Sequence, residues 1–98
     1  MKKRVVVTGL GAVTSIGYTF EEIYNSILEK KCAIGPIESF DTTDFDAKMA
    51  GEVKDFDPTK FIDRKSARRM DRVTQFGGYA SQIAFEDAGF KLGELSGD

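Results

Sequence analysis

The hydrophobic pattern of the chain opens with an uninterrupted β-branched run. Residues 4–10 contain three consecutive valines and a threonine, and the run ends at Gly9-Leu10-Gly11. A continuous valine run, as opposed to alternation of apolar and polar residues, is typical of a strand covered on both faces in a parallel sheet. We therefore predict a buried strand over residues 4–10.

Helical spacing follows the strand. Thr19 and Glu22 form a Thr-x-x-Glu capping box, which predicts a helix beginning at Thr19. Lysines at 30 and 31 close this helix with charge suited to its C-terminal end. Its apolar stripe consists of Phe20, Ile23, Ile27 and Tyr24.

The middle of the chain alternates between turn chemistry and short elements. Residues 32–46 contain Gly35-Pro36 and several aspartates and threonines, so we predict turns there. Weak alternation over residues 48–53 predicts a short strand, with Gly51 marking a bulge or a close approach. Asp57 followed by Pro58 is an N-cap with proline at the first helical position, which predicts a short helix to about residue 62.

A long helix is predicted after residue 63, capped by Asp63 or Ser66 and ended by Gly89 in the left-handed conformation. Small residues leave one flank of this helix thin enough for a neighbouring helix to pack closely. These small residues are Gly77, Gly78, Ala80 and Ala84.

The element order strand–helix–short strand–helix is the opening of an α/β sheet. A strand buried on both faces needs neighbouring strands and two layers of helices, which 98 residues with two strands can hardly supply. We therefore expect residues 1–98 to be the first part of a larger domain and incomplete as a domain.

Composition excludes several function classes. The chain is 41% hydrophobic and 31% charged, which is the balance of a globular protein. No apolar run approaches the roughly 20 residues of a membrane span or the roughly 7 of a signal peptide core, so we expect a cytoplasmic protein. A single cysteine, Cys32, and no histidine exclude a disulfide framework, a cysteine-cluster metal site, and Ser-His-Asp or Cys-His catalysis within these residues.

Two features, the glycine loop and the lone cysteine, invite a cofactor or catalytic interpretation, and the surrounding sequence argues against both interpretations. Gly9-Leu10-Gly11 starts like a dinucleotide-binding loop, but the third glycine position holds Thr14. Cys32 lies just past a helix C-terminus, where the dipole disfavours a thiolate, and no histidine can act as its base. We predict no cofactor, no metal ion and no catalytic residue in this segment.

Charge is distributed unevenly. The net charge is −2, but the basic segment, residues 60–72, holds six basic and two acidic residues and carries +4. The remainder of the chain carries −6, so the basic segment is set within an otherwise acidic protein. The basic segment is short and the rest of the chain is acidic, which makes nucleic acid a poor partner.

The residues also resemble a known family. The N-terminal run and several later motifs are similar to the β-ketoacyl-[acyl carrier protein] synthases, the condensing enzymes of fatty-acid synthesis, and most of all to the type II synthases. The resemblance keeps its order and spacing over nearly the whole chain. It is carried by residues 4–14 (RVVVTGLGAVT), 34–37 (IGPI), 40–42 (FDT), 50–58 (AGEVKDFDP), 63–72 (DRKSARRMDR) and 84–89 (AFEDAG).

This resemblance implies an α/β fold, the N-terminal part of a thiolase-type five-layered α-β-α-β-α sandwich about four times this length. It implies a homodimeric acyltransferase that condenses an enzyme-bound acyl group with malonyl-[acyl carrier protein], releasing carbon dioxide. The catalytic cysteine and histidines of the family match positions beyond residue 98, so we expect no condensation by these residues alone.

The resemblance places acyl carrier protein against Lys65, Arg68 and Arg69, the basic cluster. With Arg72, these residues are spaced i, i+3, i+4 and i+7, which is one helical face if the helix is continuous. Asp71 is also a candidate N-cap of a new helix that would turn Arg72 elsewhere, so Arg72 is left out of the cluster. The alternative to a docking role is that these charges only form a solvated helix face. Two other functions stay open: a stand-alone module that binds acyl carrier protein without chemistry, and a nucleotide-binding oxidoreductase fragment.

Overall fold

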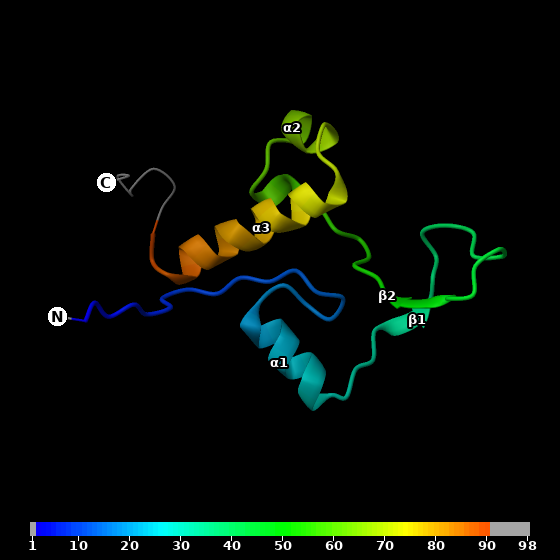
Figure 1. Cartoon of the computed structure of the whole chain (residues 1–98), viewed down its shortest axis with the longest axis horizontal. Helices are drawn as coiled ribbons and strands as arrows, with labels where there is room; N and C mark the ends of the chain where they lie inside the picture. Colours follow the sequence, from blue (N-terminus) through cyan, green and yellow to red (C-terminus); the bar gives the residue numbers. More distant parts are fainter. Residues whose placement is uncertain (1, 91–98) are drawn as a thin grey trace. The chain divides into compact units, whose positions relative to one another are not determined.

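The structure is a computed structural model and describes residues 2–90. Its contacts divide the chain into two compact units, each described by itself. One is formed by residues 13–56, and the other by residues up to 12 together with those from 57 onward. Figure 1 follows the elements of both units along the chain.

The first unit contains helix α1, Phe20–Leu28, which begins where the capping box predicts. The Thr19 hydroxyl accepts the N–H of Glu22 at 3.1 Å, and the Glu22 carboxylate accepts the N–H of Tyr18 at 2.9 Å. Glu22 thus reaches one residue beyond the N-cap. The buried Ser26 donates its hydroxyl to the Ile16 carbonyl at 2.8 Å and ties α1 to the preceding loop.

A two-stranded antiparallel sheet completes the first unit. Strand β1, Ile34–Pro36, pairs with β2, Met49–Gly51, with Gly35 opposite Ala50. The short strand predicted at 48–53 is confirmed, and Gly51 is a close approach because an added Cβ would lie 3.3 Å from the Ser15 hydroxyl. The prediction of turns throughout 32–46 is wrong at 34–36, because pairing with β2 satisfies backbone groups that the Gly-Pro signal assigns to a turn.

The second unit is helical. The 3₁₀ helix η1, Pro58–Lys60, is capped by Asp57, and α2, Arg64–Arg68, is capped by Asp63. Helix α3, Arg72–Asp87, has its own N-cap at Asp71, and its end is followed by Gly89 at φ +86°. The predicted long helix is therefore broken into α2 and α3, because the Asp71 carboxylate accepts the N–H of Thr74 at 2.8 Å and starts a second helix.

At Ala80 and Ala84 the thin flank of α3 packs against the N-terminal segment, where the sequence predicted a neighbouring helix. A Cβ added at Gly9 would clash with the carbonyl of Ala84 and lie 2.8 Å from the Ala88 side chain. A Cβ added at Gly11 would clash with the carbonyl of Ala80. Figure 1 shows this segment running alongside α3. Glycine is required at both positions because backbone meets backbone there.

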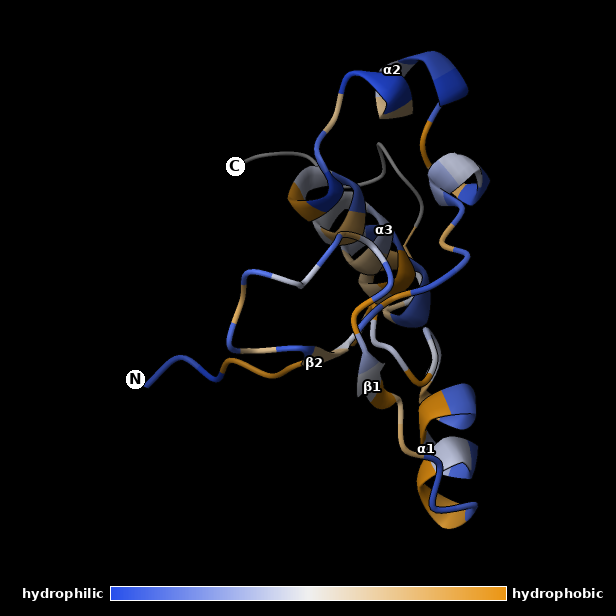
Figure 2. Ribbon diagram, turned by 90° about the vertical axis from the view of Figure 1, so that its right-hand side faces the viewer, coloured by the Kyte–Doolittle hydropathy of each residue, from blue (hydrophilic) through white to orange (hydrophobic). Residues whose placement is uncertain are grey.

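The predicted strand over residues 4–10 forms no ladder with any of residues 2–90. Val5, Val6 and Val7 are 92%, 67% and 79% exposed, and the apolar colour of this segment is visible in Figure 2. A strand needs partner strands to supply its hydrogen bonds, and no described segment supplies them.

Among the helices described over residues 2–90, none is long and apolar enough to cross a lipid bilayer.

Candidate functional site

The basic cluster, Lys65, Arg68 and Arg69, lies on α2 and its C-cap. The Asp63 carboxylate accepts the Ser66 N–H at 3.3 Å and starts the helix, so Lys65 and Arg68 fall in its short span. Arg69 is the C-cap residue. All three side chains are exposed, and within residues 2–90 they form no ion pair or side-chain hydrogen bond. Three cations are thus presented to solvent.

Packing contacts with α3 hold the helix that carries the cluster. Ala67, between Lys65 and Arg68, is buried, and its carbonyl accepts a hydrogen bond from the Gln75 side chain of α3 at 2.9 Å. Under η1, the Phe61 ring packs edge-on to the buried Tyr79 of α3 at a centroid distance of 4.9 Å. These contacts fix α2 and η1 to α3, so the cations project from an anchored segment.

Arg72 does not continue the helical face of the cluster, because the helix is not continuous: Asp71 caps a new helix, the alternative that the sequence also offers. It is the first residue of α3, and its guanidinium carbon lies 4.8 Å from the centroid of the Phe76 ring. Lys60 is arranged in the same way, with its ammonium 5.1 Å from the Phe61 ring centroid. Two cations of the basic segment therefore rest on aromatic rings, while the cluster does not.

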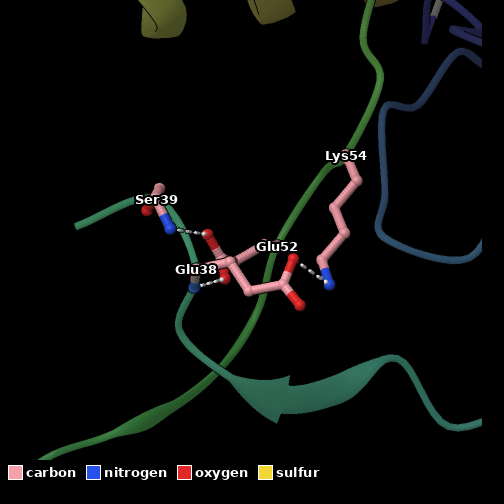
Figure 3. Close-up of polar contacts among 4 residues, drawn as sticks. All are labelled: Glu38, Ser39, Glu52 and Lys54. Atoms are coloured by element: carbon pink, nitrogen blue, oxygen red, sulfur yellow. Dashed lines mark hydrogen bonds and ion pairs between the residues drawn. The ribbon is translucent and has the colours of Figure 1, made fainter. Parts of the chain in front are cut away.

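Charges of the first unit are used within the fold. The Glu52 carboxylate accepts the N–H of Glu38 at 2.7 Å and that of Ser39 at 3.3 Å, as Figure 3 shows. These hydrogen bonds, that of Glu38 foremost, hold the pKa of Glu52 below its ordinary value. Lys54 pairs with Glu38 at 2.8 Å, and the same carboxylate raises the pKa of Lys54. These contacts of Glu52 and Lys54 with residues 38 and 39 close the loop that follows β1.

Cys32 is an exposed free thiol whose sulfur lies 4.0 Å from the carbonyl oxygen of Ile34. It borders an open hollow of about 770 Å³ between α1 and β1. Two carboxylates also line this hollow, Glu22 and Glu52, and both already bind backbone N–H groups. Within residues 2–90, no three side chains of metal-ligating type gather at one point.

The glycine loop has a packing role. Leu10, between the two glycines, donates its N–H to the Asp87 carboxylate at 2.9 Å. This carboxylate occupies the backbone donor that a dinucleotide loop would offer to phosphate, and α3 fills the space beside both glycines. The glycines serve the contact with α3.

One contact of the basic segment escaped prediction from the sequence: the stacking of Arg72 on Phe76. Its signal is the i, i+4 spacing of the two residues on a helix, which brings their side chains together. That signal is readable only once α3 is known to start at Arg72 and not several residues earlier.

Comparison with known proteins defines the family. The model for "Beta-ketoacyl synthase, N-terminal domain" matches residues 2–98, and the chain belongs to the β-ketoacyl synthase family. Among curated proteins it is 52% identical over 97 residues to the 3-oxoacyl-[acyl-carrier-protein] synthase 2 of Synechocystis, covering 99% of this chain and 23% of the relative. The synthase 2 of Vibrio harveyi is 43% identical over 93 residues, covering 95% of this chain and 22% of that relative.

Solved structures agree with this assignment. The ishigamide ketosynthase/chain length factor superposes with a TM-score of 0.79 at 34% identity, over 93% of this chain and 23% of that chain. A β-ketoacyl synthase from Burkholderia phymatum gives 0.78 at 32% identity, over 95% of this chain and 23% of that chain. The fold of the segment is thus that of the corresponding part of ketosynthases. The chain spans about a quarter of the length of these relatives.

Proposed function

We propose that these residues are the N-terminal segment of a β-ketoacyl-[acyl carrier protein] synthase, a cytoplasmic, homodimeric acyltransferase of fatty-acid biosynthesis with a five-layered thiolase-type sandwich. The family membership, the names of the relatives and the span of about a quarter of their length support this. The reaction transfers an acyl group from the enzyme to the malonyl unit of malonyl-[acyl carrier protein]. A carbon–carbon bond forms as carbon dioxide leaves and the thioester to the enzyme breaks.

Within that enzyme, this segment supplies scaffold and part of the docking surface for acyl carrier protein. The observation that carries the docking role is the basic cluster, which is exposed on an anchored helix and pairs with no anion among residues 2–90. An acidic carrier protein fits such a surface, because opposite charges raise the rate of encounter and give reversible affinity. These side chains meet the protein part of the substrate, so they contribute equally to ground-state and transition-state binding.

The test is charge reversal in the gene product that contains this chain. Replacing all three residues of the cluster (Lys65→Glu, Arg68→Glu and Arg69→Glu) should raise the apparent KM for acyl carrier protein substrates about 10-fold, because several exposed ion pairs become repulsive contacts. Turnover of a small thioester that lacks the protein should change little.

A matched control makes the same change in net charge elsewhere. Lys3, Lys30 and Lys31 are exposed and form no ion pair within residues 2–90, so their triple replacement by glutamate tests a general charge effect. The proposal expects little change in KM from this control. Equal effects of the two triple variants, or none from the cluster variant, would contradict the docking role.

A further inference from the structure

We propose that Lys60, at the end of η1, is a further cation of the docking surface and binds a carboxylate of the acidic carrier protein. The inference rests on the docking role proposed above and deepens it, because it extends the surface from α2 onto η1. It begins from the state of the Lys60 side chain. This side chain is exposed, and within residues 2–90 it forms no ion pair or side-chain hydrogen bond.

An anchored aromatic ring positions the Lys60 ammonium without neutralising it. The nitrogen lies 5.1 Å from the centroid of the Phe61 ring, which is within the range of a cation–π contact. Phe61 packs edge-on to the buried Tyr79 of α3, so the ring itself is held in place. Less side-chain entropy is lost on binding when the lysine stem is ordered beforehand. Lys60 therefore presents a full positive charge from a preferred position.

The two aspartates that flank Lys60 in the chain are used as helix caps. The Asp57 carboxylate accepts the N–H and the hydroxyl of Thr59, at 2.9 and 2.6 Å. The Asp63 carboxylate accepts the N–H of Ser66 at 3.3 Å. Neither carboxylate forms an ion pair with Lys60. An anion of a partner protein thus meets a cation that no described acid already binds.

Packing between η1 and α2 keeps Lys60 near the cluster. The 3₁₀ helix ends at Lys60, α2 begins at Arg64, and the two elements contact each other. Lys65 follows Lys60 by five positions, and five residues span at most about 18 Å even when fully extended. Four turns of a partner helix span about 22 Å, so carboxylates along one face of an acidic helix can meet Lys60 and the cluster together.

The first test measures the protection of lysine amines in the gene product. Acetic anhydride modifies exposed lysines, and mass spectrometry gives the rate of modification at each one. Saturating acyl carrier protein should slow the modification of Lys60 and Lys65 severalfold, because a carboxylate bound to an ammonium shields it. Lys31 is exposed and lies outside the basic segment, so its rate should not change.

The second test measures the energetic effect of the Lys60 charge. Lys60→Gln should raise the apparent KM for acyl carrier protein substrates about 2- to 5-fold, the effect of one exposed charge contact, and leave kcat nearly unchanged. Lys60→Arg keeps the charge and should restore most of the affinity. Lys31→Gln is the matched control, since it removes one exposed charge elsewhere and should leave KM unchanged.

The third test isolates the role of the ring. Phe61→Leu should raise the same KM in the wild-type background and add little in the Lys60→Gln background, because the ring acts on docking through Lys60. An equal rise in both backgrounds, together with slower turnover of a small thioester, would show that Phe61 is merely structural and would overturn the positioning of Lys60 by the ring.

The outcomes separate this inference from the proposal beneath it. Protection of Lys65 but not of Lys60, beside a wild-type KM for Lys60→Gln, would overturn the role of Lys60 and keep the docking surface. Protection of neither lysine would overturn both. Equal rises in KM for Lys60→Gln and Lys31→Gln would reveal a general charge effect and would also overturn the role of Lys60.

Discussion

Helix α3 and the N-terminal segment beside it are built from different kinds of contact. Helix α3 is closed at both ends by groups close in the chain: Asp71 caps its start, and Gly89 follows its end. Residues 2–9 form no backbone hydrogen bond with any described residue, and Val5–Val7 stay largely exposed. The two regions meet at Gly9, Gly11 and the Leu10 N–H.

This difference shows which parts of the segment are self-sufficient. A capped helix satisfies its own backbone groups, so α3 needs nothing beyond its neighbours for its local structure. An extended valine run satisfies none of its own and gains stability only when strands pair with it. The exposed valines therefore agree with the proposal that these residues belong to a larger sheet domain.

The largest expected effect comes from the place where the two regions touch. Gly11→Ala should lower the free energy of unfolding of the gene product by about 3 kcal/mol, because the new methyl group overlaps the Ala80 carbonyl of α3. Chemical denaturation measures this change.

Gly77→Ala is the matched control for that substitution. A Cβ at Gly77 meets nothing within 4 Å, so the change should stabilise α3 by about 0.5–1 kcal/mol through helix propensity. If both alanines have the same effect on stability, the close contact between the glycines and α3 is wrong.

A smaller effect is expected from acid, and its effect on helix content acts through the caps of η1 and α3. The hydrogen bonds from Thr74 to Asp71 and from Thr59 to Asp57, side chain first and then backbone N–H, hold the pKa of each aspartate below its ordinary value. A lowered folded pKa contributes stability above the unfolded pKa, about 3.9, and this stability is lost as the pH falls through the folded value. Helix content should therefore fall as the pH drops below about 4.

Circular dichroism between pH 7 and pH 2 measures this loss. The double variant Asp57→Asn and Asp71→Asn keeps a capping oxygen without the titrating charge, so its helix content should depend less on pH over this range. An acid transition that is identical in variant and wild type would contradict the contribution of these caps.

The sequence predicts the parts of the fold that depend on neighbouring residues. Thr19, Asp57 and Asp63 cap the helices that their positions indicate, because a cap needs only a side chain and the next few N–H groups. The pairing of Ile34–Pro36 with β2 was not predicted, since it depends on contacts across more than ten residues. The partner of the thin flank of α3 was not predicted either, because small residues fit a helix and an extended segment alike.

The candidate site divides in the same way. The basic cluster was identified from the spacing of its residues and from the family resemblance, and its docking role stays a prediction. The spacing places Arg72 on the same face only if one helix is continuous, and the alternative that Asp71 caps a new helix is confirmed. Composition gives the number of charges, but only the structure distinguishes Lys54, paired with Glu38, from the cluster, which forms no ion pair within residues 2–90.

The most direct test of the docking role is the salt dependence of the apparent KM for acyl carrier protein in the gene product. The wild type is compared with a variant in which Lys65, Arg68 and Arg69 are all replaced by glutamine. Raising the salt concentration from about 0.1 M to 1 M shortens the Debye length from about 10 Å to 3 Å, so the wild-type KM should rise severalfold. The neutral variant should start at a higher KM and respond much less to salt. Parallel salt dependence in the two proteins would show that these three cations do not carry the attraction.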